Sequence, residues 1–436
     1  MAREMVILDV EKLRRRMSLT QEELWKKHCI YRVPAYLKEL CPRAYSPQLV
    51  SVGPYHHGEF HLRAMEEHKH RAVQHLLQRS GKPIEEFRRA VEGDLQRLMD
   101  CYEQLEPPWD DPATFLQLMM LDGCFLYEVL RGYSAARDYD DMDPVFSFHG
   151  FLNICPYMVP DLLMTENQLP LRVIERIYAV EHARMNEENG HPTNEMVHKF
   201  LSNTNTLLEM PLGLHVLDVA RKGITRGPIK KLPEQRLPAV PVRSASELQD
   251  AGIIFRKSPK SGIKEINFTN GILTLPPFSV DNSTESVFLN FIAFERLHPG
   301  AGREVSSYIA FMSGLMNSVK DVAFLMSTGL IEGTLGSDDA IAKLINDIAK
   351  NVFFDPSSSL CEVRDALNRH YAEEMKSWTR RIREWRRNLH ETYFKNPWTM
   401  ISLVAAGCLL GLTLTQTAYS ALAYYKGNGN QLPNRP

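Results

Sequence analysis

Hydrophobic residues recur every three to four positions over long stretches of this chain of 436 residues, a spacing typical of helices that bury one face. The most regular stretch is 362–394, where an apolar stripe from Val363 to Tyr393 lies opposite most of the arginines. A second stripe runs from Val305 to Met326. In the first half of the chain, helices are predicted near 62–79, 84–105, 112–133, 160–180 and 193–220. The chain is therefore predicted to be mainly α, with a multi-helix body.

Three segments interrupt the helical pattern. Residues 44–58 contain Pro and Gly at a density that excludes a long helix, so they are predicted to be extended and rich in turns. Residues 221–243 contain seven Lys or Arg, one Glu and four Pro, which is typical of an exposed linker. Ile266 and Phe268 alternate with polar residues before Asn270-Gly271, the strongest short-range signal for a β-hairpin. A small β-hairpin element is therefore predicted within the helical body.

No charged residue occurs between Asn396 and Tyr425, and this stretch is rich in aliphatic residues. As an α-helix, the 28 residues from Trp398 to Tyr425 would be about 42 Å long, whereas crossing a bilayer takes about 20 residues. Trp398 at one end and Tyr424 and Tyr425 at the other lie where interfacial aromatic residues occur. The sequence therefore predicts one C-terminal transmembrane helix. A buried helix of the body is the alternative.

Gly407 and Gly411 form a GxxxG motif inside this stretch. Small residues at this spacing allow two membrane helices to approach closely, which would permit self-association through the transmembrane helix. The motif also arises by chance in apolar helices, and the alternative is that it has no role.

Basic residues are concentrated on one side of the predicted transmembrane helix. Lys426 and Arg435 follow it, whereas a larger group precedes it within about 20 residues. That group consists of Lys376, Arg380, Arg381, Arg383, Arg386, Arg387 and Lys395. The positive-inside rule therefore predicts that the body faces the cytosol, from either the plasma membrane or an endomembrane. The first residues contain acids and too short an apolar run for a signal peptide.

These features predict an order of parts along the chain. The parts are a helical lead-in (1–29), the first half of the helical body (30–220), the basic Pro-rich linker (221–243), a second half with the β-hairpin and the long amphipathic helix (244–395), the transmembrane helix (396–425) and a disordered tail (426–436).

Composition excludes some classes of protein. A net charge of −2 gives no electrostatic reason to expect nucleic acid as the main partner. The seven cysteines are scattered and form no CxxC motif, which fits a reducing compartment and implies no disulfide framework.

Histidines are concentrated early in the chain, next to several glutamates. Imidazole is a common ligand of zinc and iron, so a metal site or a metal-dependent enzyme is one hypothesis. The candidate ligands are His56, His57, His61, His68 and His70. Gly58 would break a helix that stacks His57 over His61, and the alternative is a polar turn followed by an exposed helix.

Glu166, Asn167 and Gln168 stand among apolar neighbours in the sequence DLLMTENQLP. Such a trio could form a buried polar network that holds a ligand. The alternative is local: Asn167 or Gln168 closes the preceding helix, and Pro170 starts the next one.

Signals of catalysis are weak. Asp122-Gly123-Cys124 would offer a thiol nucleophile, but no histidine is tied to it by a known spacing, and its apolar neighbours indicate a core helix. The sequence has no GxSxG, GxxxxGK[ST], HExxH or GxGxxG motif. Neither an enzymatic activity nor a cofactor is therefore predicted.

The apolar stripe of 362–394 includes Trp378 and Trp385. This face could pack on the protein's own body, pair with a helix of a partner protein, or lie on the bilayer surface with the arginines toward anionic headgroups. Packing on the body is the default expectation for an amphipathic helix.

Several segments together resemble a plant family called domain of unknown function 247. They include IYRVP (30–34), AYSPQLVSVGPYHHG (44–58), LDGCFLYEVL (121–130), DLLMTENQLP (161–170), YFKNPW (393–398) and LTLTQTAY (412–419). The resemblance implies a plant origin, a mostly helical body and one C-terminal membrane anchor. It implies no catalytic residue or cofactor. Some grass members are associated with pollen–stigma self-incompatibility, which points to recognition or signalling at a membrane.

The sequence thus predicts a membrane-anchored protein that acts by protein–protein recognition, with an unidentified protein and the lipid bilayer as partners. The metal-binding hypothesis for the histidines at 56–70 is kept as the alternative.

Overall fold

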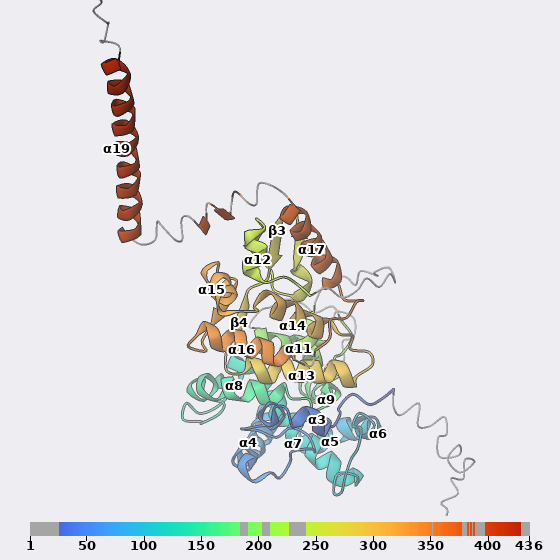
Figure 1. Cartoon of the computed structure of the whole chain (residues 1–436). Helices are drawn as coiled ribbons and strands as arrows, with labels where there is room; N and C mark the ends of the chain where they lie inside the picture. The colour runs from blue at the N-terminus through green and yellow to red at the C-terminus, as the bar shows by residue number, and fades with distance from the viewer. Residues whose placement is uncertain are drawn as a thin grey trace, which may run out of the picture. The chain divides into compact units, whose positions relative to one another are not determined.

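The structure is a computed structural model that describes residues 26–183, 191–202, 210–225, 241–350, 352–376, 382, 384–385, 387–388 and 397–428. The chain divides into two compact units. The first unit consists of Met1–Ser246 and Ile254–Leu367, and the second of Glu247–Ile253 and Asn368–Pro436. Helices dominate the described residues, which confirms the prediction of a mainly α fold (Figure 1).

Helices that pack around α7 form the first half of the first unit. The elements are α3 (Ala35–Lys38), η1 (Pro42–Tyr45), η2 (Phe60–Leu62), α4 (Ala64–Ser80), α5 (Ile84–Glu92), α6 (Leu95–Met99), α7 (Pro112–Leu130), η3 (Gly132–Arg137), α8 (Phe148–Leu162), α9 (Leu171–His182), α10 (Pro192–Ser202) and α11 (Val216–Ile224). The Asp111 side chain caps α7 by accepting from the Thr114 N–H. α4, α5 and α9 all contact α7, so its apolar residues are buried on most sides (Figure 1).

Burial explains why α7 is so apolar. Among the described residues, it is the single helix whose length and composition would suit a membrane span, and 78% of its apolar window is buried within the protein. α14 (Glu304–Leu315) and α15 (Val319–Ser327) meet the same criteria only as a pair, and they are bent by 100° at the break between them. α7 is therefore a core helix.

The rest of the chain combines helices with two small sheets. Its elements are α12 (Ala245–Asp250), β1 (Ile254–Lys257), η4 (Ile263–Glu265), β2 (Asn267–Thr269), β3 (Ile272–Leu275), β4 (Phe278–Val280), α13 (Thr284–Leu297), α14, α15, β5 (Ile331–Gly333), α16 (Asp338–Ala349), α17 (Leu360–Lys376) and α19 (Pro397–Asn428). α16 packs against α13, α14 and α15, and its residues Ile341, Ile345 and Ile348 are buried.

The predicted hairpin is confirmed. β2 and β3 are antiparallel, with Phe268 opposite Leu273, and the turn is Asn270-Gly271, both with positive φ. β1 adds to β3 in parallel and completes a sheet of order β1-β3-β2. β4 and β5 form a separate parallel pair that the sequence did not predict.

Several predicted helices are divided in two. The segment 84–105 forms α5 and α6, the segment 193–220 forms α10 and α11, and the stripe from Val305 to Met326 is broken before α15. There Ser318 and Asp321 form a capping box, which starts a new helix in a new direction. The prediction of one helix over 160–180 was wrong. α8 begins earlier, at Phe148, and ends at Leu162, and α9 begins at Leu171.

Other boundaries also differ from the prediction. α11 continues through Ile224, so the first residues of the predicted linker are helical, and 226–240 lie outside the described residues. Most of the predicted lead-in and the end of the predicted tail lie outside them as well.

A continuous helix, α19, covers the charge-free stretch from Pro397 onward and has 32 residues. The helical conformation of this stretch is confirmed. Its crossing of a membrane gains no support from the structure, in which α7 is the helix that meets the criteria for a span. The side chains of Trp398, Tyr424 and Tyr425 lie outside the described residues, so their role as interfacial anchors stays a prediction.

Candidate functional site

Buried polar side chains from residues 161–168 hold the extended segment that begins at Ser46. Asp161 is buried near the end of α8, and its carboxylate accepts from the backbone N–H groups of Gln48 (2.9 Å), Leu49 (2.6 Å) and Val50 (2.9 Å). Burial raises the pKa of Asp161, although these three N–H groups oppose the shift. The carboxylate thus accepts hydrogen bonds from backbone amide groups that do not pair with a neighbouring strand.

Asn167 continues this pairing toward Gly53. Its Oδ1 accepts from the Val52 N–H at 2.6 Å, and its Nδ2 donates to the carbonyls of Val50 (2.9 Å) and Asp161 (3.0 Å). The amide side chain therefore acts like a short piece of neighbouring strand. The predicted buried network exists, and it holds the chain's own backbone.

Gln168 closes the end of α8. Its Nε2 donates to the carbonyls of Leu162 and Met164, both at 2.7 Å, and its Oε1 accepts from the Leu217 N–H at the start of α11. Pro170 is the residue before α9 and does not occupy its first turn. The capping interpretation is therefore confirmed for Asn167 and Gln168, whereas Pro170 lies just before the helix that it was expected to start. That the network holds a ligand stays a prediction.

Glu166 fixes the start of the described chain. Its buried carboxylate accepts from the Val33 N–H (2.6 Å) and from Lys38 Nζ (2.7 Å), and His56 Nε2 lies 3.5 Å away. Burial alone would raise the pKa of Glu166, but the interactions with His56 and Lys38 outweigh it and lower the pKa. Glu166 therefore joins the segments around 33 and 56 to the segment between α8 and α9.

Asp122 binds the same extended segment from α7. It accepts from the Gly53 N–H and from Lys69 Nζ, both at 2.7 Å, and Lys69 is fully buried. Burial raises the pKa of Asp122 against the effect of Lys69. Cys124, two residues further along α7, has a pKa raised to about 12 by burial, so its thiol stays protonated and is not activated as a nucleophile.

The structure does not assemble the candidate histidine ligands into a metal site. No group of three or more His, Cys, Asp or Glu side chains with metal-binding geometry occurs in the described part of the chain. His56 is buried with its Nδ1 2.7 Å from Glu59, and His61 Nε2 donates to the Pro47 carbonyl. The rings of His57 and Trp109 form a T-shaped contact with their centroids 5.0 Å apart.

His68 and His70 lie on α4 and do not join the other three candidates. Burial lowers the pKa of His68, and His70 is exposed. The interpretation of this region as a polar turn followed by an exposed helix holds for His70. It is wrong for His56, because that side chain is enclosed by the segment it helps to fix.

His215 is a buried histidine that the sequence analysis did not select. Its Nε2–H donates to the Cys29 carbonyl at 3.0 Å, and its Nδ1 accepts from the Asp218 N–H at the start of α11. The second contact needs an unprotonated Nδ1, so with the proton on Nε2 the ring is the neutral tautomer. Burial lowers the pKa of His215 to about 4, so the ring stays neutral in the folded protein at physiological pH.

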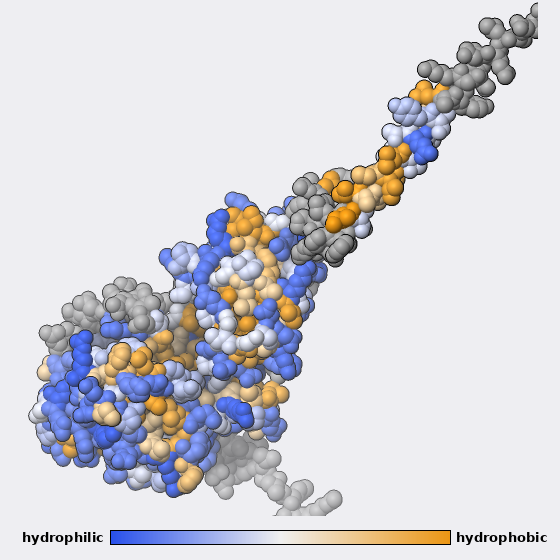
Figure 2. Space-filling model, turned by 90° about the vertical axis from the view of Figure 1, so that its left-hand side faces the viewer, coloured by the Kyte–Doolittle hydropathy of each residue, from blue (hydrophilic) through white to orange (hydrophobic). Residues whose placement is uncertain are grey.

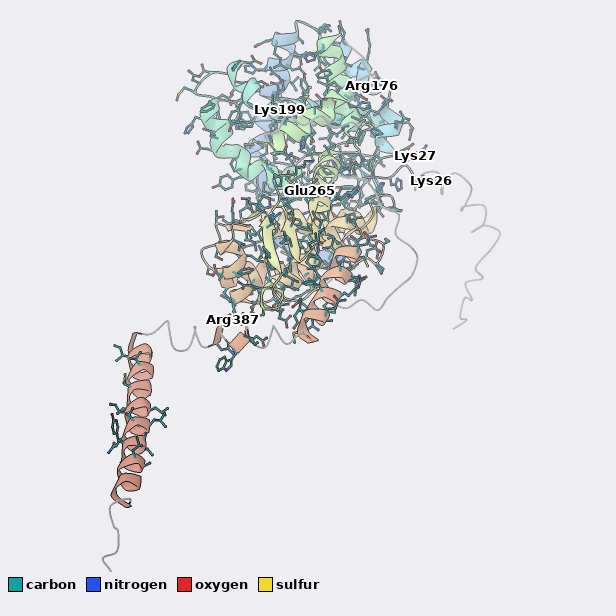
Figure 3. The ribbon with its side chains drawn as sticks, turned by 90° about the horizontal axis from the view of Figure 1, so that it is seen from above. Lys26, Lys27, Arg176, Lys199, Glu265 and Arg387 are labelled. Carbon is teal, nitrogen blue, oxygen red and sulfur yellow. The ribbon has the colours of Figure 1, made fainter. Side chains whose placement is uncertain are left out.

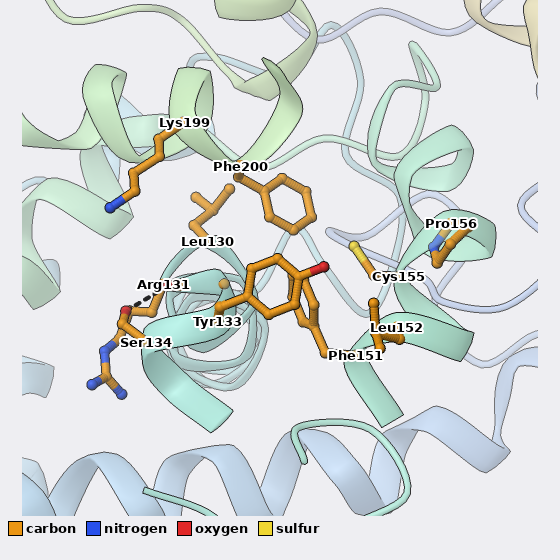
Figure 4. A pocket seen from close by; sticks show the side chains of 11 residues that line it. Leu130, Arg131, Tyr133, Ser134, Phe151, Leu152, Cys155, Pro156, Lys199 and Phe200 are labelled. Atoms are coloured by element: carbon orange, nitrogen blue, oxygen red, sulfur yellow. Dashed lines mark hydrogen bonds between the residues drawn. The ribbon is translucent and has the colours of Figure 1, made fainter. Parts of the chain in front are cut away.

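A pocket of about 320 Å³ lies between α7, η3, α8 and α10 (Figure 4). Tyr133, Phe151 and Phe200 line it, with ring centroids 4.7 Å apart for Tyr133–Phe151 and 6.2 Å for Phe151–Phe200. Burial raises the pKa of Cys155 in its wall to about 11. The pocket is wide enough for a small apolar group.

Comparison with known proteins places this architecture in a family. The domain of unknown function 247, described as a plant protein of unknown function, matches residues 30–412. The chain belongs to this family. The match covers the extended segment, the network around Glu166 and the first part of α19.

Two relatives come from Arabidopsis thaliana. The UPF0481 protein At3g47200 is 30% identical over 439 residues, which covers 93% of this chain and 89% of the relative. The putative UPF0481 protein At3g02645 is 27% identical over 177 residues, or 40% of this chain and 32% of the relative. No solved structure matches the chain significantly.

Gly53 and Gly58 provide a test of the network. Both have positive φ, so Ala at either position is strained by about 1–2 kcal/mol. A Cβ at Gly53 would lie 2.5 Å from the Gln168 carbonyl oxygen, whereas no described atom lies within 4 Å of one at Gly58. We expect Gly53→Ala to reduce the free energy of unfolding by about 2 kcal/mol more than Gly58→Ala, measured by chemical denaturation. Equal losses would contradict the close packing on Gln168.

The pKa of His215 predicts a loss of stability in acid. Between about pH 6.5 and 4 the unfolded chain binds a proton that the folded chain does not, so stability falls as the pH falls, by up to about 3 kcal/mol. His215→Gln should make the free energy of unfolding less dependent on pH in this window. His70→Gln, at an exposed position, is the matched control and should retain the wild-type dependence. The same slope in all three proteins would show that His215 is not the group that titrates.

Proposed function

We propose that this protein attaches to a membrane through α19 and acts there by recognising another protein. The observation that carries the proposal is the exposure of large aliphatic side chains along α19 (Figure 2). Leu410 is 67% exposed, and Leu409, Leu412 and Leu414 are similarly exposed. A helix of 32 residues is about 48 Å long and exceeds the roughly 30 Å of a hydrocarbon core. Such an apolar surface is more stable in the hydrocarbon core of a bilayer than in water.

The charge distribution supports a cytosolic orientation of the body. The basic residues that precede α19 outnumber those that follow it, which is the bias of cytoplasmic flanks. Self-association through Gly407 and Gly411 is compatible with this arrangement, since no described atom lies within 4 Å of a Cβ at either position.

An exposed apolar stripe before α19 supports the recognition role. The stripe is buried at Leu367, but Met375, Ile382 and Trp385 are exposed, and Trp385 is 69% exposed. Packing of the stripe on the body stays a prediction. Trp378 lies outside the described residues. Trp is a frequent anchor of protein–protein interfaces, so this stripe is the proposed contact for a partner helix.

An ion pair of Arg387 supports a fixed position of this stripe within the second unit. Its guanidinium pairs with Asp250, and both residues belong to the second unit. Figure 3 labels Arg387 in the segment that precedes α19. The buried titratable groups Asp122, Asp161, Glu166 and His215 are all engaged with backbone groups, which favours binding over catalysis as the proposed activity.

Membrane attachment can be tested with one substitution. Leu410→Arg should cost roughly 2.5–3.5 kcal/mol of insertion and move the protein from the membrane pellet to the supernatant in plant cells. Leu152→Arg introduces the same charge at an exposed leucine of the body and should leave the protein in the pellet. If the Leu410 variant still sediments with membranes like the control, α19 is not the anchor.

Recognition can be tested at Trp385. We expect Trp385→Glu to reduce the amount of co-purified partner by about tenfold or more, because a charge replaces an aromatic anchor. Phe353→Glu is the control, since Phe353 is an exposed aromatic residue that does not belong to the stripe. Both variants should keep the unfolding temperature of the wild type. Unchanged recovery of every partner with the Trp385 variant would refute this contact.

A further inference from the structure

Cys29 and Cys101 are adjacent in the first unit although about 70 residues separate them. The Cys29 N–H and the Ile30 N–H both donate to the Cys101 carbonyl, at 2.8 and 2.9 Å. The Glu103 N–H returns a hydrogen bond to the Ile30 carbonyl at 3.0 Å, and Ile30 forms a parallel bridge with Tyr102. The two segments are therefore paired like short parallel strands.

This pairing places the two cysteines opposite each other. Cys29 precedes Ile30 and Cys101 precedes Tyr102, so both side chains lie on the same face of the paired segments. Paired strands are about 4.8 Å apart, which is within the Cα separation of about 4.4–6.8 Å that a disulfide spans. The pairing of the backbone is therefore compatible with a bond between the sulfur atoms.

The thiols differ in reactivity. A hydrogen bond between them lowers the pKa of Cys101 and raises that of Cys29. Cys101 is partly exposed, whereas Cys29 is only 3% exposed. Cys101 thus has the more acidic and more accessible thiol, whose Sγ–H donates to the Arg97 carbonyl at 3.2 Å, and Cys29 is the buried thiol that can react with it afterwards.

Four other cysteines of the described chain differ from Cys101. Burial raises the pKa of each of their thiols, which makes them poor nucleophiles. They are Cys41, Cys124, Cys155 and Cys361.

We propose that Cys29 and Cys101 form a reversible disulfide bond when the protein meets an oxidised low-molecular-weight disulfide such as glutathione disulfide. The Cys101 thiolate attacks one sulfur of that disulfide, which forms a mixed disulfide and releases one glutathione thiolate. Cys29 loses its proton and attacks the Cys101 sulfur, which releases the second glutathione. The protein loses two electrons and two protons overall, and glutathione disulfide is reduced to two glutathione molecules.

The bond would fasten the start of the described chain. Val33, held by Glu166, follows Cys29 by four residues, and His215 donates to the Cys29 carbonyl. The bond therefore links these two contacts covalently to the end of α6, and it closes a loop of about 70 residues, which stabilises the folded state relative to the unfolded one.

The full chain in detergent provides the test. Purified protein is equilibrated with mixtures of reduced and oxidised glutathione, free thiols are blocked with N-ethylmaleimide, and proteolytic peptides are identified by mass spectrometry. We expect a cross-linked peptide pair that contains Cys29 and Cys101, with both thiols lost together and recovered with dithiothreitol. The oxidised protein should unfold several degrees higher than the reduced protein.

Two variants test whether the cross-link and the stabilisation depend on Cys101. Cys101→Ser should abolish both the cross-link and the shift in unfolding temperature, and it avoids disturbing the buried Cys29. Cys155→Ser should retain both. The proposal is overturned if Cys29 and Cys101 are fully blocked at the most oxidising ratio, or if Cys101→Ser keeps the shift of the wild type.

Discussion

The first unit depends on one constraint, which is that the backbone amides between Gln48 and Gly53 must be paired although no strand lies beside them. Asp161, Asn167 and Asp122 supply the acceptors from α8, the segment before α9, and α7. A buried amide without a partner costs about 1–3 kcal/mol, so several of them together would offset much of a domain's net stability. The extended segment and the helices around it therefore order as one structure.

Local signals predicted much of the fold. The Asn270-Gly271 turn and the apolar periodicity of α4 and α7 depend on neighbouring residues, and both appear as expected. The breaks inside longer helical patterns were missed, because caps such as Ser318 act within a pattern whose apolar spacing continues across them. The function of Asp161 was missed because its partners lie about 110 residues earlier, a distance at which no local pattern operates.

The candidate site shows the same limit. Glu166, Asn167 and Gln168 were selected because polar residues stood among apolar ones, and that signal correctly marked a buried network. What the network holds could not be read from spacing, since backbone groups leave no signature in the sequence. The pairing of Cys29 with Cys101 was likewise invisible, because it follows from two segments that meet only in the folded chain.

The hydrogen bonds around Asp161 also decide whether α7 can be counted as a membrane-spanning helix. The segment with Gln48 and Val50 precedes α7, and Asp161 follows it, yet these residues bond directly to one another. Both flanks of α7 must therefore occupy one compartment. A hydropathy scan that scored α7 as a crossing would invert the side assigned to every later residue, and the folded body removes that crossing from any topology map of the chain.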